Sequence, residues 1–231
     1  MSGAKLDSQS TKLWDWPVRI IHWSFVLLLP ALWWTWKSGQ LPLHELLGYI
    51  MLGLLIFRLY WGFFGSSTAR FAGFVKGPRA IAAYVRTLFS KAGEPVVGHN
   101  PLGGLSVIAL LGLLLTQVTL GLFTQDVDGM ESGPLTYLVS YEFADGARGW
   151  HGFLFNVLLA IVALHVCAIV FYLLVKRDNL VGPMLTGRKQ MPELLHAPRF
   201  APLWRGLLGV ALSAAIAYWV SKGCPIPWMP A

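Results

Sequence analysis

Charged residues are scarce in this sequence of 231 residues, where Asp, Glu, Lys and Arg make up only 13%. A soluble domain usually carries about 25%, and here apolar residues reach 55%. Cysteine is scarce too, because a chain with two cysteines has neither a disulfide framework nor the usual Cys-based zinc sites. No Cys-x-x-Cys-His occurs, which excludes a covalently attached c-type haem. Together these absences exclude a disordered protein, a nucleic-acid binder and an ordinary soluble enzyme.

What the sequence has instead is long apolar runs. A membrane-spanning helix needs about 20 mostly apolar residues, and five stretches qualify. The first is rich in Trp and has no convincing small-residue cleavage site after it, so we interpret it as a helix and not as a signal peptide. The sequence therefore predicts an all-α, integral-membrane helical bundle. The five expected spans are approximately 18–36, 44–64, 102–123, 150–175 and 203–220.

The distribution of Lys and Arg predicts the orientation, because cytoplasmic loops are enriched in both. Only Lys37, Arg148 and Lys222 fall on the side of the membrane opposite the N-terminus. We therefore expect a bacterial inner-membrane protein with a cytoplasmic N-terminus and a periplasmic C-terminus. The other fifteen basic residues fall on the N-terminal side: Lys5, Lys12, Arg19, Arg58, Arg70, Lys76, Arg79, Arg86, Lys91, Lys176, Arg177, Arg188, Lys189, Arg199 and Arg205.

Two loops carry further information. Residues 65–101 mix aromatic and aliphatic side chains with Arg and Lys, and Pro78 is suited to open a helix. This pattern predicts a basic amphipathic helix on the inner membrane surface, for which lipid anchoring is the simplest role. The loop between spans three and four is expected to form an outward negative patch. Its acidic residues are Asp126, Asp128, Glu131, Glu142 and Asp145.

Four histidines lie at matching depths in the expected spans. His22 is one turn inside the inner start of span one, whereas His44 and His151 open spans two and four on the outer side. His165 follows His151 by fourteen residues, which places it within about 40° of the same helix face and about 21 Å further along. We therefore expect two pairs, His22 with His165 and His44 with His151. Two imidazoles at each of two depths suit two stacked b-type haems, with both axial positions of each iron filled.

Alternatives exist for each of these residues. A single intramembrane His often only bridges helices through a polar contact, and a di-metal centre lacks the carboxylates that it would need beside the His pairs. Gly48 and Gly152 suit either the approach of a flat macrocycle or close helix packing. Cations near each surface are expected to bind the haem propionates, or to serve as plain interface anchors. These cations are Arg19 and Arg58 inside, and Lys37 and Arg148 outside.

Five segments in this order resemble the prokaryotic cytochrome b561 family, over about residues 12 to 187. They are Trp14-Asp15-Trp16-Pro17-Val18-Arg19-Ile20-Ile21-His22-Trp23; His44-Glu45-Leu46-Leu47-Gly48-Tyr49; Arg58-Leu59-Tyr60-Trp61-Gly62-Phe63-Phe64-Gly65; Gly98-His99-Asn100-Pro101-Leu102-Gly103-Gly104; and Trp150-His151 with His165. The family is also similar to the b-type subunits of nickel–iron hydrogenases and formate dehydrogenases. The resemblance implies a four-helix core that binds two b haems, with His22/His165 and His44/His151 as axial ligands. The fifth span departs from the family, so we divide the chain into a core, 1–187, and a C-terminal part, 188–231, that either covers the bundle or holds a partner.

The resemblance implies an electron-transfer protein or a quinone-linked oxidoreductase of a respiratory chain, which works between membrane quinone and a redox partner. The acidic outer loop favours a basic partner such as a periplasmic c-type cytochrome. We expect quinone on the inner side near Arg19, Arg58 and His99, although His99 suits the start of the third helix equally well. Alternatives are the membrane anchor of a hydrogenase or dehydrogenase, a superoxide:quinone oxidoreductase, which the acidic outer face disfavours, and a cofactor-free transporter or scaffold.

Overall fold

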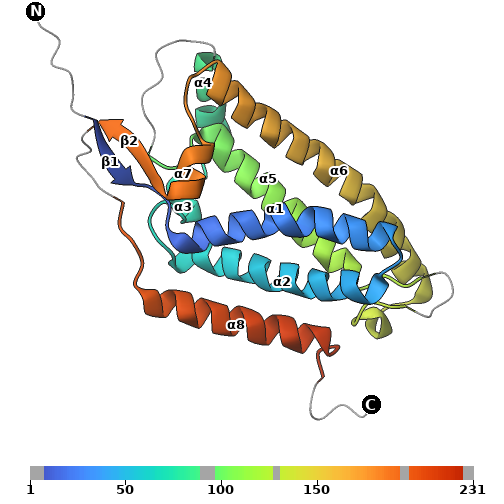
Figure 1. Ribbon diagram of the computed structural model, residues 1–231. Coiled ribbons are helices and arrows are strands. Elements are labelled where there is room, and N and C mark those ends of the chain that lie inside the picture. The colour runs from blue at the N-terminus through green and yellow to red at the C-terminus, as the bar shows by residue number, and fades with distance from the viewer. Residues whose placement is uncertain (1–7, 89–96, 127–130, 193–197, 226–231) are drawn as a thin grey trace, which may run out of the picture. The chain divides into compact units, whose positions relative to one another are not determined.

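The computed structural model describes residues 8–88, 97–126, 131–192 and 198–225. Five of its helices are long and apolar enough to cross a membrane. This confirms the predicted all-α membrane bundle. The expected residues Lys5, Lys91 and Asp128 lie outside the described residues. The five helices are α1 (Trp16–Lys37), α2 (Leu41–Phe64), α5 (Pro101–Gly121), α6 (Tyr141–Leu174) and α8 (Leu203–Ser221) (Figure 1).

Each expected span falls on one of these helices, and the largest difference is at the start of α6. This helix begins at Tyr141 instead of near residue 150. Its 34 residues correspond to about 51 Å, which exceeds the roughly 30 Å of a bilayer core. The additional turns carry the exposed ion pair between Asp145 and Arg148, so they suit water or lipid headgroups better than hydrocarbon.

The outward faces of the long helices are apolar. Leu27 and Leu164 are 70% and 65% exposed, and many other large hydrophobic side chains are similarly uncovered. Such a surface would be costly in water, because each buried apolar side chain of this size is worth about 1.5–3 kcal/mol. Lipid chains are therefore its natural cover, and the protein is a multi-pass membrane protein.

The chain divides into two compact units, and each long helix contributes one segment to each unit. The first unit contains Met1–Ile20, Tyr60–Ala109 and Ala163–Gly206, and the second contains Ile21–Leu59, Leu110–Val162 and Leu207–Ala231. The first unit also holds three short helices: α3 (Phe71–Phe74), α4 (Pro78–Thr87) and α7 (Val181–Thr186). The second unit adds a short 3₁₀ helix, Thr136–Leu138.

A small sheet in the first unit was not expected from the sequence. Strand β1 (Ser8–Lys12) pairs antiparallel with β2 (Arg188–Pro192), with Ser10 opposite Gln190 (Figure 1). The pairing continues at the start of the following segment, where the backbone N–H groups of Leu13 and Trp14 donate to the carbonyl oxygen of Gly187. The sheet thus joins the chain before α1 to the chain after α7.

Asp15, in the Trp-Asp-Trp-Pro segment, caps the start of α1. Asp15 is only 5% exposed, and one carboxylate oxygen accepts from the backbone N–H of Val18 at 3.0 Å. The other oxygen accepts from the indole N–H of Trp61 at 2.8 Å. A side chain that accepts from the first turn of a helix is a typical N-cap, so Asp15 both starts α1 and attaches it to the end of α2.

The helix predicted after Pro78 is present as α4, with Gly77 as N-cap and Pro78 in the first turn. The hydroxyl groups of Tyr84 on α4 and Tyr172 on α6 lie 2.8 Å apart. This contact holds α4 against the end of α6. Its expected role at the lipid surface stays a prediction.

In the second unit the fifth long helix packs against α2. The Cα of Gly53 lies so close that an added Cβ would be 3.5 Å from the Cβ of Ala217. Beyond α8, the carbonyl oxygen of Gly223 accepts a 2.6 Å hydrogen bond from the hydroxyl of Tyr137. Gly223 has φ +74°, a conformation that glycine adopts without strain. Helix α8 therefore covers part of α2, and its end is attached to the loop between α5 and α6.

Candidate functional site

The second unit brings His44 and His151 together, as the sequence predicted. His44 lies in the first turn of α2 and His151 in the third turn of α6. Their ring centroids are 6.3 Å apart, and the ring planes are inclined by 78°. Both side chains are half-buried. Two imidazoles from separate helices thus face a common space at one end of the second unit.

The ring of His44 is held by the end of α1. Its Nδ1 lies 2.9 Å from the carbonyl oxygen of Leu32 and 3.4 Å from the hydroxyl of Thr35. A carbonyl oxygen can only accept, so Nδ1 carries the proton and donates. The hydroxyl of Thr35 donates to the carbonyl oxygens of Ala31 and Leu32, and this side chain is 1% exposed. In this tautomer the lone pair of His44 is on Nε2, the atom available to a metal.

The ring of His151 is held in the same way by α5. Its Nδ1 donates to the carbonyl oxygen of Gln117 at 2.9 Å, and the side-chain amide of Gln117 donates to the carbonyl oxygen of His151 at 3.0 Å. Gly121 is one turn further along α5, and a Cβ there would lie 3.2 Å from Cε1 of His151. The absence of a side chain at Gly121 therefore allows the ring to approach the α5 backbone, with Nε2 again free to bind a metal.

The spacing of the two rings fits one metal ion between them. A metal–imidazole nitrogen bond is about 2 Å, and the ring centre lies roughly 1 Å beyond the nitrogen, so two opposed imidazoles on one metal have centroids about 6 Å apart. Within the part of the chain that the structure describes, no three His, Cys, Asp or Glu side chains are grouped so that they could hold a metal ion. A haem iron, which takes only two axial ligands from the protein, is compatible with both observations.

The two glycines next to this pair are not in close helix contacts. Gly48 is one turn after His44, and Gly152 follows His151 directly. Among the described residues, no neighbouring atom lies within 4 Å of a Cβ added at either position. The described contacts thus give no support to tight helix packing as the reason for these glycines, and the approach of a flat macrocycle stays a prediction.

The other two histidines fall in different units. His22 belongs to the second unit, where its ring makes an edge contact with Trp23 at 5.3 Å. His165 belongs to the first unit, where its Nδ1 lies 3.1 Å from the hydroxyl oxygen of Ser106 on α5. The pairing of His22 with His165 therefore stays a prediction.

The first unit holds Arg19 and His99, and both lie near Trp14. The Nε of Arg19 donates to the carbonyl oxygen of Met184 at 3.2 Å. A Cβ added at Gly187 would be 3.0 Å from both Nη1 of Arg19 and the carbonyl oxygen of Trp14. The indole of Trp14 lies 4.7 Å from the ring of His99.

His99 is not the residue that caps α5. Its ring lies between Trp14 and Phe74, whose ring centroid is 4.5 Å away. The capping contact comes from Asn100, whose side-chain oxygen accepts from the backbone N–H of Gly103 at 2.8 Å. Asn100, and not His99, therefore caps α5, and a quinone-binding role for His99 stays a prediction.

The three other predicted cations are in different surroundings. Arg58 on α2 is 6% exposed and thus strongly buried for a charged side chain. Lys37 lies 5.1 Å from the centre of the Trp36 ring, and Arg148 forms its exposed ion pair with Asp145. Lys37 and Arg148 thus have local partners typical of interface anchors, and binding of propionates by any of the three stays a prediction.

The residues that orient the histidines could not be identified from the sequence. Gln117, Thr35 and Ser106 were not among the predicted site residues. The contacts from Leu32 and Gln117 to the two rings use main-chain oxygens, which any residue provides. Only the relative placement of α1, α2, α5 and α6 within the second unit reveals them.

These features define a multi-pass helical membrane protein with histidines suited to bind haem. Comparison with known proteins gives the family: the chain belongs to the prokaryotic cytochrome b561 family, which it matches over residues 13–187. Membership makes it a b-type cytochrome and implies haem b. It is 23% identical over 218 residues to a Rhizobium leguminosarum bv. viciae protein named "Probable Ni/Fe-hydrogenase B-type cytochrome subunit", a match that covers 80% of this chain and 90% of that protein. No solved structure matches the chain.

Proposed function

We propose that this protein carries two b haems and passes electrons across the bilayer between membrane quinone and a redox partner on the outer side. The observation that supports this most directly is the His44–His151 pair. Its centroid distance of 6.3 Å and the two Nδ1 donors leave one Nε2 on each side of a common space. His22 and His165 are proposed as the ligands of the second haem.

In this proposal the protein's own residues determine how the haems are bound and which reaction they support. A bound haem supplies a one-electron carrier. Two histidine ligands per haem would leave no position for oxygen, so the site would suit electron transfer and not oxygen binding. The main-chain carbonyl oxygens of Leu32 and Gln117 hold the outer imidazoles in the metal-binding tautomer. Arg58, buried within α2, is proposed to compensate the charge of a propionate.

The two membrane faces are proposed to meet different partners. Asp126, Glu131, Glu142 and Asp145 lie between α5 and α6 or in the first turns of α6, on the face that the charge distribution predicts to be outside. Their charge favours a basic partner such as a c-type cytochrome. Quinone is proposed to bind on the opposite face, near Arg19, Arg58 and His99.

A second candidate function is the membrane cytochrome subunit of a hydrogenase. It is favoured by the name of the Rhizobium relative, which aligns along 80% of this chain. In this case the outer face would dock a hydrogenase instead of a soluble cytochrome. Affinity purification from a native membrane, followed by a hydrogen-oxidation assay, distinguishes the two, because a hydrogenase subunit should bring that activity with it.

The test of the proposed function is a haem count. A pyridine haemochrome assay on the full-length purified protein, expressed with ample haem supply, should give two haem b per chain. One haem per chain would leave one His pair without a ligand role. Protein that binds no haem under these conditions would contradict the proposal and favour a membrane scaffold or transporter.

A further inference from the structure

The hydrogen-bond partner of His165 is of a different kind from the partners of His44 and His151. In the first unit the Oγ of Ser106 lies 3.1 Å from Nδ1 of His165. Ser106 is on α5 and His165 is on α6, and both side chains are half-buried. A hydroxyl group can donate or accept, so this contact adapts to whichever tautomer the ring adopts.

From this contact, and on the basis of the proposed function, we propose that Ser106 is a positioning residue that orients His165 and tunes the haem iron bound by it. A neutral imidazole that binds iron through Nε2 carries its proton on Nδ1. The Nδ1–H of His165 then donates to Oγ of Ser106. An acceptor on Nδ1–H increases the basicity of a ligating histidine, which stabilises the ferric over the ferrous state and lowers the reduction potential.

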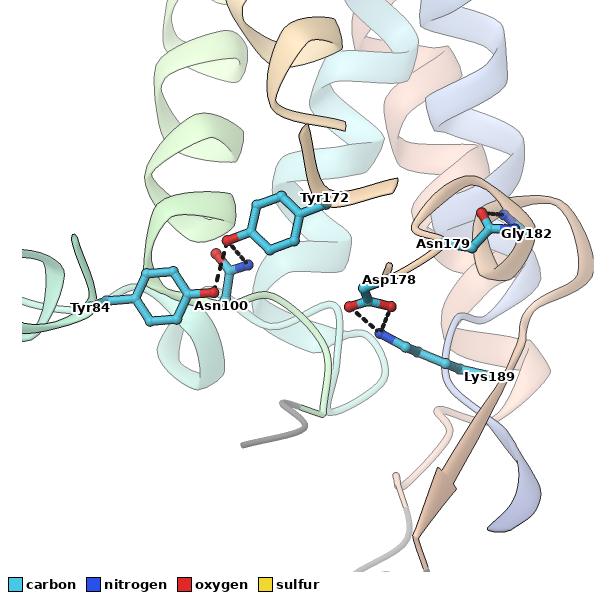
Figure 2. A network of polar contacts seen from close by, with 7 residues as sticks. All are labelled: Tyr84, Asn100, Tyr172, Asp178, Asn179, Gly182 and Lys189. Atoms are coloured by element: carbon cyan, nitrogen blue, oxygen red, sulfur yellow. Dashed lines mark hydrogen bonds and ion pairs between the residues drawn. The ribbon is translucent and has the colours of Figure 1, made fainter. Parts of the chain in front are cut away.

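A second contact, separate from that between Ser106 and His165, joins α6 to the start of α5. Tyr172 follows His165 by seven residues, about two turns along the same face of α6. Its hydroxyl accepts from the side-chain amide of Asn100 at 3.0 Å and lies 2.8 Å from the hydroxyl of Tyr84 (Figure 2). Helix α6 thus has anchors to α5 and α4 that do not involve Ser106. Removal of the Ser106 hydroxyl should therefore affect the imidazole more than the docking of the helices.

The chain offers matched controls for this substitution. Thr116, also on α5, is exposed and donates its hydroxyl to the carbonyl oxygen of Gly112 in its own helix. Thr116→Ala therefore removes a hydroxyl from α5 without contact to a histidine. Tyr172→Phe weakens the separate docking contact and leaves Ser106 in place. Ser106→Thr retains a hydroxyl at the tested position.

The experiment is an optical redox titration of the purified full-length variants, with the haem content measured in each. We expect Ser106→Ala to keep two haems and to raise the midpoint potential of one of them. The expected effect is a threefold to tenfold loss of preference for the ferric state, and tenfold corresponds to about 59 mV for one electron. Ser106→Thr should restore the wild-type potential, and Thr116→Ala and Tyr172→Phe should leave both potentials unchanged. Selective loss of one haem in Ser106→Ala, restored in Ser106→Thr, would support the same role.

Two results would overturn this inference while the proposed function stands. One is a Ser106→Ala protein with two haems and both potentials unchanged. The other is an equal shift in Tyr172→Phe, which would assign the effect to helix docking. A wild-type protein without haem would overturn the proposed function itself, and this inference with it.

Discussion

His165 in the first unit and the His44–His151 pair in the second unit are held by different means. In the first unit the contact to His165 runs through the side chain of Ser106, and side chains also join Trp61 to Asp15 and Asn100 to Tyr172. An ion pair between Asp178 and Lys189, with an N–O distance of 2.7 Å, joins the segment after α6 to β2 (Figure 2). Each of these contacts is lost with a single substitution.

In the second unit, by contrast, the rings of His44 and His151 are bound to the main chain. His44 and His151 donate to the carbonyl oxygens of Leu32 and Gln117, and Gly121 allows the close approach of one ring. No side-chain substitution removes a carbonyl oxygen. The difference teaches that a single substitution can change the environment of His165, whereas the environment of His44 and His151 depends on the paths of the helix backbones.

The largest expected effect comes from removal of the ligands themselves. If the chain binds two haems as proposed, His151→Ala and His165→Ala should each lose one of them, and because the two proposed sites have different surroundings, the spectra of the two variants should differ. The measurement is the haem content together with the reduced-minus-oxidised spectrum. His99→Ala, which changes an imidazole held between Trp14 and Phe74, is the control and should keep both haems. If His165→Ala retained both haems with unchanged spectra, the pairing of His22 with His165 would be wrong.

The next largest effect is a loss of stability when a side-chain contact of the first unit is removed. Asp15→Ala removes the cap of α1 and the acceptor of the Trp61 indole, and we expect a loss of about 2 kcal/mol in stability, since lost caps and lost buried hydrogen bonds each cost about 1 kcal/mol. The measurement is the apparent Tm of the purified protein in detergent. Asp15→Asn retains an oxygen toward Val18 and should lose less. An unchanged Tm in Asp15→Ala would show that this contact does not stabilise the first unit.

The helices and the proximity of one histidine pair could be predicted from the sequence, because both depend on the length of apolar runs and on position along the expected spans. A run of about 20 apolar residues defines a span, and His44 and His151 each open an expected span on the same side, so their proximity followed from topology. The β1–β2 pair was missed because Ser8–Lys12 is polar and has no apolar alternation. The start of α6 was missed since its first turns are charged. The partners of the His44 and His151 rings could not be predicted, because main-chain oxygens leave no pattern in a sequence.

A smaller effect is expected at Gly121, where the ring of His151 closely approaches α5. In Gly121→Ala the added Cβ would lie 3.2 Å from Cε1 of His151, so the ring must move by a few tenths of an ångström. We expect both haems to remain bound, a loss of about 1 kcal/mol, typical of mild overpacking, and a raised potential of one haem as the bond to Gln117 lengthens. Gly112→Ala on the same helix is the control, because no described atom lies within 4 Å of its added Cβ. An equal response in both variants would contradict a specific role for Gly121.

The smallest expected effect is on the rate at which Cys224 reacts with a maleimide. The same labelling reaction tests on which side of the membrane Cys224 lies. Partial burial raises the pKa of the Cys224 thiol above its usual value. Since the thiolate is the reactive form, less of it is present at a given pH, and the reaction with a maleimide should keep accelerating with pH after a small-molecule thiol has levelled off. The background is Cys167→Ser, which removes the exposed cysteine of α6, and Cys224→Ser in that background is the blank.

A membrane-impermeant maleimide should label Cys224 in spheroplasts, because the excess of Lys and Arg predicts a periplasmic C-terminus. Labelling only after the membrane is permeabilised would reverse the orientation and with it the faces assigned to the acidic loop and to quinone.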